Sequence, residues 1–85
     1  MLIDITFDLS RIKMQFDPVG HVWVKFPYNP SLIAEIKQLK DSDCNFYEWQ
    51  PDYGYWIIYT WEGWVLPKLF ELLSKYYPRK NNVPS

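Results

Sequence analysis

Few residues in this chain could carry out catalysis. His21 is the single histidine and Cys44 the single cysteine. A catalytic nucleophile needs a base within hydrogen-bond reach. The chain has no second histidine or cysteine, and no base lies near Cys44 in the sequence. His21 follows a turn glycine and is interpreted as an ordinary surface histidine, and Cys44 as a buried or half-buried thiol. We therefore expect a protein that is not an enzyme, although a small enzyme is kept as a third hypothesis.

Metal and phosphate sites are also poorly supported. Asp41 and Asp43 form a close acidic pair, as do Asp4 and Asp8, but magnesium and calcium require more oxygen ligands in a closer array. Solvated loop and strand charges explain these residues equally well. The chain has no glycine-rich phosphate loop of the GxxxxGK[ST] type, so we expect no ATP-hydrolysing motor within it. We expect no metal and no cofactor.

Aromatic and basic residues are interleaved along the predicted strands, in a pattern that could bind nucleic acid. Bases stack on aromatic rings, and lysine and arginine contact phosphates. The residues expected to form such a platform on the open face of a sheet are Arg11, Lys13, Trp23, Lys25, Tyr55 and Tyr59. Two alternatives remain open: the aromatics pair across strands for stability, or they meet a protein partner. A competing basic cluster, Lys75, Arg79 and Lys80, also fits charges that complement a helix dipole and a solvated tail.

Three alternating segments at the start of the chain predict strands that would position these residues. Apolar residues occupy every second place, which is the period of a half-buried strand. The turn Asp17-Pro18-Val19-Gly20 would join the second segment to the third, because proline suits its second position and glycine tolerates positive φ. The alternating apolar residues are Ile3, Ile5 and Phe7, then Ile12, Met14 and Phe16, then Val22, Val24 and Phe26.

Two helices and a second hairpin complete the predicted elements. Asn29 is an N-cap candidate, with Pro30 at the first position of a helix. The apolar face of this helix carries Leu32, Ile33, Ile36 and Leu39. Residues 44–50 and 55–60 predict a hairpin around Pro51-Asp52-Tyr53-Gly54, in which Trp49 opposes Trp56. The last helix runs from about residue 62 to 77 and tolerates Pro67 only in its first turn.

These elements predict a single α+β domain over residues 1–78, with residues 79–85 as a flexible tail. The fold would be a mostly antiparallel sheet of about five strands, in the order β-β-β-α-β-β-α, with two helices packed on one face. Trp49 and Trp56 would lie in the core beneath the helices. The order of the strands stays open, because the connection through the first helix could place residues 44–50 on either side.

Composition limits the function classes. The chain has 85 residues, of which 48% are hydrophobic, which favours one folded domain. Its net charge of −1 counts against a sequence-independent nucleic-acid binder, although a local basic face could still serve. No apolar run approaches the roughly 18 residues of a membrane span, and no signal peptide is evident. With one cysteine, we expect a soluble, cytoplasmic protein that does not contact membranes.

Two motifs resemble a known domain. The first runs from Trp23 through Pro27-Tyr28-Asn29-Pro30 to Lys37, and the second is Trp49-Gln50-Pro51 followed by Trp56. This order of a strand, a Tyr-Asn-Pro helix start, Trp-x-Pro and a further Trp resembles the HARP domain, the accessory module of annealing helicases. The resemblance covers about residues 22–76. It implies a DNA-binding module that acts beside a helicase or repair factor. The alternative is a protein-interaction or regulatory module without nucleic-acid contact, and the oligomeric state stays open.

Overall fold

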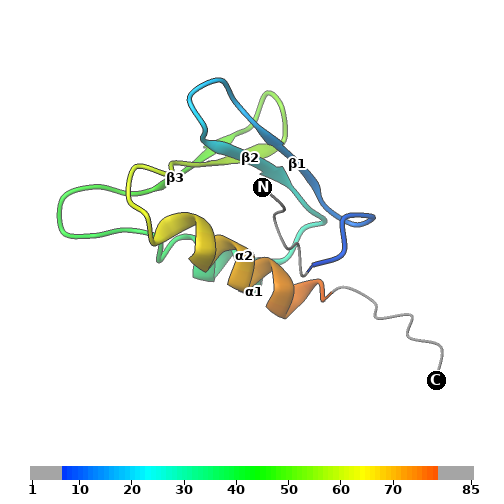
Figure 1. Cartoon of the computed structure of the whole chain (residues 1–85). Coiled ribbons are helices and arrows are strands. Elements are labelled where there is room, and N and C mark those ends of the chain that lie inside the picture. Colours follow the sequence, from blue (N-terminus) through cyan, green and yellow to red (C-terminus); the bar gives the residue numbers. More distant parts are fainter. Residues whose placement is uncertain (1–6, 79–85) are drawn as a thin grey trace.

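The alternating segments form an antiparallel sheet that lies on a layer of two helices (Figure 1). The computed structural model describes residues 7–78 of the chain. Along the chain the elements are β1 (Lys13–Phe16), β2 (Val22–Lys25), α1 (Pro30–Ile36), β3 (Tyr47–Gln50), β4 (Tyr55–Ile58) and α2 (Val65–Tyr76). The predicted α+β class is therefore confirmed, with the helices on one side of the sheet.

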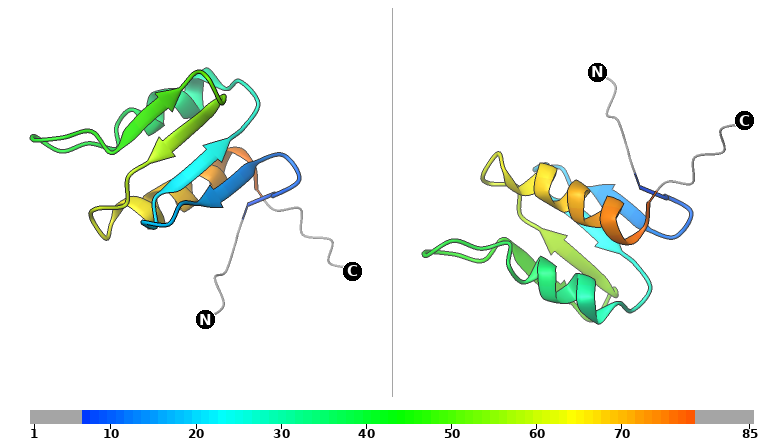
Figure 2. Two further views of the ribbon diagram at one scale, coloured as in Figure 1. Left: turned by 90° about the horizontal axis from the view of Figure 1, so that it is seen from above. Right: turned by 90° about the horizontal axis from the view of Figure 1, so that it is seen from below.

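The strand order, which the sequence left open, is β1-β2-β4-β3. Both hairpins form, and β4 returns to pair with the central strand β2. In the second hairpin Trp49 lies opposite Trp56 and Gln50 opposite Tyr55, as the four-residue loop predicted. The strands β1 and β3 are consequently the two edges of the sheet, and Figure 2 shows them on opposite sides.

The described sheet has four strands, not the five expected. Residues 3–6 of the predicted first strand lie outside the described residues, as do residues 79–85 of the predicted tail. Phe7 makes only an isolated antiparallel bridge, to Pro78. Its buried ring packs against Phe70 of α2, with 5.4 Å between ring centres, and the backbone N–H of Asp8 donates to the carbonyl of Tyr77. The backbone at residues 7–8 thus pairs with the end of α2.

Helix α1 begins as its sequence predicts, whereas α2 begins at Val65 and not at about residue 62. Asn29 is extended, with φ −145°, and its side-chain oxygen accepts a hydrogen bond from the N–H of Leu32 at 3.1 Å. This contact satisfies one of the N–H groups that lack a partner in the first turn. Pro67 lies in the first turn of α2, where its missing N–H costs no helical hydrogen bond. However, α1 ends at Ile36, so Leu39 reaches the core from the turn that follows the helix.

The core lies between the sheet and the helices, but it includes fewer side chains of the edge strands than predicted. Trp56 is 8% exposed, in agreement with the prediction, whereas Trp49 on the same face is 46% exposed and the prediction that it is core is wrong. Phe16 on the other edge strand is 48% exposed. The two helices cover the middle of the sheet and leave side chains at its edges in solvent. The fully buried side chains include Val22, Val24, Leu32, Ile36, Ile58, Val65, Leu69 and Leu73.

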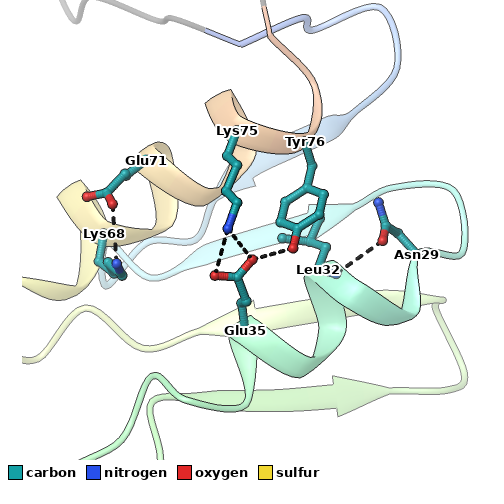
Figure 3. A network of polar contacts seen from close by, with 7 residues as sticks. All are labelled: Asn29, Leu32, Glu35, Lys68, Glu71, Lys75 and Tyr76. Carbon is teal, nitrogen blue, oxygen red and sulfur yellow. Dashed lines mark hydrogen bonds and ion pairs between the residues drawn. The ribbon is translucent and has the colours of Figure 1, made fainter.

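A polar contact joins the two helices at the surface of their interface (Figure 3). Glu35 of α1 accepts a hydrogen bond from the Tyr76 hydroxyl and forms an ion pair with Lys75, with 3.1 Å between Lys75 Nζ and Glu35 Oε2. The hydrogen bonds from Tyr76 and from Lys75 lower the pKa of Glu35 below its ordinary value. Lys75 is therefore occupied in an interhelical contact, while Arg79 and Lys80 of the competing basic cluster lie outside the described residues.

Candidate functional site

The open face of the sheet brings most of the predicted platform together. Val22 and Val24 are buried under the helices, so Trp23 and Lys25 point to the opposite, open face. Lys13 of β1 lies directly opposite Lys25 of β2 in the antiparallel register. On the same face, the next pair of opposed residues along these strands is Gln15 and Trp23. Two lysines and a tryptophan therefore occupy adjacent positions on this face.

Two further aromatic rings lie beside that of Trp23. The ring centres of Tyr53 and Tyr55 lie 6.1 Å and 6.3 Å from that of Trp23, both in edge-to-face arrangements. The ammonium group of Lys25 lies 5.6 Å from the centre of the Tyr55 ring, within cation–π distance. We call Lys13, Trp23, Lys25, Tyr53 and Tyr55 the open-face cluster. It combines three rings with two positive charges.

Tyr53 is a member of this cluster that the sequence analysis missed. It belongs to the turn between β3 and β4, and strand alternation says nothing about the direction of a turn side chain. It is nevertheless 64% exposed, and it lies beside Trp23 of the neighbouring hairpin. The only sequence signal was the run of aromatic residues Tyr53, Tyr55 and Trp56 around Gly54.

Asp17 fixes the position of Trp23. One carboxylate oxygen of Asp17 accepts hydrogen bonds from the N–H groups of Val19, Gly20 and His21. The other accepts from the indole N–H of Trp23 at 3.3 Å. Partial desolvation would raise the pKa of Asp17, but these hydrogen bonds outweigh it and the pKa is lowered. The carboxylate thus closes the β1–β2 turn and orients the tryptophan.

Charge is distributed unevenly over the open face. Like charges directly opposite each other on paired strands destabilise a sheet, and Lys13 and Lys25 are such a pair. Glu48 lies on β3, at the opposite edge of the sheet from Lys13, and accepts hydrogen bonds from the hydroxyl of Tyr59 and the amide of Gln50. No carboxylate among the described residues forms an ion pair with Lys13 or Lys25. The lysine end of this face is therefore suited to an anionic ligand.

Two of the six predicted platform residues do not belong to the open-face cluster. The prediction that Arg11 lies on the open face is wrong: it precedes β1, and its guanidinium carbon lies 5.1 Å from the centre of the Tyr77 ring at the end of α2. Tyr59 follows β4 and is bound to Glu48, and its ring stacks on Trp61. The hydrogen bond to Glu48 and desolvation raise the pKa of the Tyr59 hydroxyl. Strand alternation fails at Arg11 because this residue lies before the start of β1, whereas Tyr59 meets Glu48 on the open face at a distance from Trp23 along the sheet.

Neither His21 nor Cys44 lies where the sequence predicted. His21 is buried, contrary to the prediction of a surface histidine, and its Nδ1 accepts a hydrogen bond from the N–H of Thr60 at 3.0 Å. Cys44 is exposed, contrary to the prediction of a buried or half-buried thiol. Desolvation and the nearby carboxylates of Asp41, Asp43 and Glu62 raise the pKa of its thiol, which lowers the fraction of reactive thiolate.

The described residues form neither a metal site nor a membrane-spanning helix. Within residues 7–78, no three histidine, cysteine or acidic side chains lie close enough together to hold a metal ion. Neither helix in this part of the chain has the length and apolarity needed to cross a bilayer.

Comparison with protein-family models, with curated proteins and with solved structures found no match to this chain. The resemblance to the HARP domain therefore stays a prediction.

Proposed function

We propose that this chain is a non-enzymatic module that binds DNA through the open-face cluster, at single-stranded segments or where they join a duplex. The observation that carries the proposal is the pair Lys13 and Lys25, which no carboxylate of residues 7–78 neutralises, set beside the rings of Trp23 and Tyr55. A bound phosphate would relieve the repulsion between the two lysines. The adjacent rings would stack with unpaired bases, which a closed duplex does not offer.

The role of such a module would be accessory. The predicted likeness to the HARP domain favours DNA over RNA and favours a helicase or repair factor as the enzyme that it assists. A cytoplasmic location belongs to the same proposal, because the exposed thiol of Cys44 remains reduced most readily there.

The test is a fluorescence-anisotropy titration with single-stranded, forked and duplex oligonucleotides at two salt concentrations. We expect tighter binding to the single-stranded and forked DNA than to the duplex, with an affinity that falls steeply with salt. Replacing both lysines by alanine should reduce the slope of log K against log salt by about 1.4, since each phosphate contact on a single strand contributes about 0.7.

Substitutions of aromatic residues test the stacking. Trp23→Ala and Tyr53→Ala should each weaken binding by about 1–3 kcal/mol and leave the salt slope unchanged. Tyr53 lies in an exposed turn, so its variant remains informative even if loss of Trp23 disturbs the fold. Arg11→Ala is the matched control: it removes a positive charge away from the cluster and should leave affinity unchanged. The proposal fails if no oligonucleotide binds at low salt, or if both aromatic variants bind as the parent does.

A further inference from the structure

A groove lies between α1 and the edge strand β3, on the side of the sheet that carries the helices. Its volume is about 460 Å³. Its walls include Ile33 of α1, Tyr47 and Trp49 of β3, and Trp56 of β4, together with the exposed Tyr28. Exposed apolar side chains gathered around a hollow mark an interaction site more often than scattered ones do.

The backbone of β3 offers unpaired hydrogen-bonding groups along this groove. The N–H of Tyr59 donates to the carbonyl of Phe46 at 2.9 Å, so Phe46 presents its carbonyl to the β4 side. Because the backbone groups of a strand alternate between its two sides, those of Tyr47 and Trp49 point away from β4. Over residues 7–78, no hydrogen bond from any other element reaches the backbone of either residue. This edge is open to a further strand.

The groove also has a defined charge. Lys37 lies on its wall, directly after α1, and no carboxylate of the described chain forms an ion pair with it. Glu48 also borders the groove, but its side chain alternates with those of Tyr47 and Trp49 and so points to the open face of the sheet, where its carboxylate accepts hydrogen bonds from Tyr59 and Gln50. The unneutralised charge at this site is therefore positive.

We propose that this groove binds an extended peptide segment of a partner protein, which adds to the sheet as a strand beside β3. The peptide backbone would pair with the N–H and carbonyl groups of Tyr47 and Trp49. Alternate side chains of the peptide would point into the groove, where an aromatic or branched apolar residue contacts Trp49 and Trp56. A carboxylate of the peptide would pair with Lys37. Strand addition of this kind draws affinity from the backbone and specificity from the pockets.

An extended peptide fits these observations better than other ligands. An acyl chain or a nucleobase would fill the apolar groove but leave the strand edge of β3 unpaired. The groove lies on the helix side of the sheet and the open-face cluster on the other side, so the site stands independently of the proposed DNA binding.

The test uses two matched sets of acetylated hexapeptides in which Val, Ile, Phe or Trp alternates with Thr. One Thr is replaced by Glu in the first set and by Lys in the second. We expect binding by the Glu set, with Kd below about 1 mM for its best members, and at least tenfold weaker binding by the Lys set. In NMR titrations, the amides of Tyr47 and Trp49 should shift. N-methylation of the alternate peptide amides that face β3 should abolish binding.

Three variants assign the contacts. Trp49→Ala should weaken binding about tenfold or more, as loss of a central aromatic anchor does. Trp61→Ala is its control, because Trp61 is 65% exposed and does not line the groove. Lys37→Glu should reverse the preference between the Glu and Lys sets.

The proposal is overturned if no hexapeptide of either set binds, or if N-methylated peptides bind equally well. It is also overturned if sedimentation shows that the chain forms a dimer that Trp49→Ala dissociates, because the groove would then be occupied by a second copy.

Discussion

At the scale of single residues, Trp49 and Trp56 show how position in the sheet decides the role of a side chain. The two rings lie on the same face, with their centres 5.1 Å apart. Trp56 is on a central strand and is buried, whereas Trp49 is on an edge strand and is half-exposed. A buried aromatic contributes mainly to stability, while an exposed one next to a groove is available to a ligand.

This difference predicts unequal costs of truncation. Trp56→Ala should lower the free energy of unfolding by about 3–5 kcal/mol, since it leaves a cavity in the core. Trp49→Ala should cost no more than about 1.5 kcal/mol, most of it from the lost contact between the two rings. Urea denaturation monitored by circular dichroism measures both. Equal effects of the two substitutions would contradict the burial difference between the strands.

At the scale of elements, the contact between α1 and α2 depends on a carboxylate. Tyr76 and Lys75 of α2 both bind Glu35 of α1 and lower its pKa (Figure 3). The ionised form of Glu35 is thus favoured by folding. A carboxyl whose pKa is lower in the folded state stabilises the protein above its unfolded pKa, and this contribution is lost as the pH falls through the folded pKa.

The stability of the helix pair should therefore depend on pH through Glu35. Glu35→Gln should be less stable than the parent at pH 7, and the difference should shrink as the pH falls below about 4.5, the ordinary pKa of this carboxyl. Thermal melts of both proteins between pH 3 and pH 7 measure the effect. Glu71→Gln is the control, because Glu71 pairs with Lys68 on the exposed surface of α2 alone. A constant difference between parent and Glu35→Gln across this range would show that ionisation of Glu35 does not stabilise the interface.

At the scale of the whole molecule, Tyr77 joins the two layers near the end of α2. Its ring is buried and lies under the guanidinium of Arg11, and its hydroxyl donates to the carbonyl of Pro27, which follows β2, at 3.3 Å. Its own carbonyl accepts from the N–H of Asp8 at 2.8 Å. Segments from the beginning, middle and end of the described chain thus meet at one side chain.

We expect Tyr77→Ala to destabilise the whole domain cooperatively. Loss of the buried ring should cost about 3–5 kcal/mol, a large fraction of the roughly 5–15 kcal/mol available to a domain. Tyr77→Phe keeps the ring and loses only the hydroxyl contact, so it should cost about 0.5–1.5 kcal/mol. Urea denaturation followed by both tryptophan fluorescence and circular dichroism measures the changes. Separate transitions by the two probes for Tyr77→Phe would indicate that the layers unfold independently.

The local pattern of the sequence determined the elements and the hairpin pairings. Alternation placed Trp23 and Lys25 on one face and Val22 and Val24 on the other, and the loop length set Trp49 opposite Trp56. The N–H groups in the first turn of a helix have no helical acceptor. A side chain such as that of Asn29 can therefore accept from one of them, and Pro67 is tolerated there because its missing N–H costs no hydrogen bond. All of these depend on residues a few positions apart, whose geometry is set by the backbone period and by turn chemistry.

The tertiary structure decided the strand order, and with it the exposure of particular side chains. The pairing of β2 with β4 joins residues more than 30 positions apart, and no local period specifies it. This pairing makes β3 an edge strand, which leaves Trp49 half-exposed and opens the groove beside α1. The same long-range packing places Arg11 on Tyr77, His21 beneath Thr60 and Tyr53 beside Trp23. Burial depends on which distant segment covers a residue, so residue type and spacing alone could not determine it.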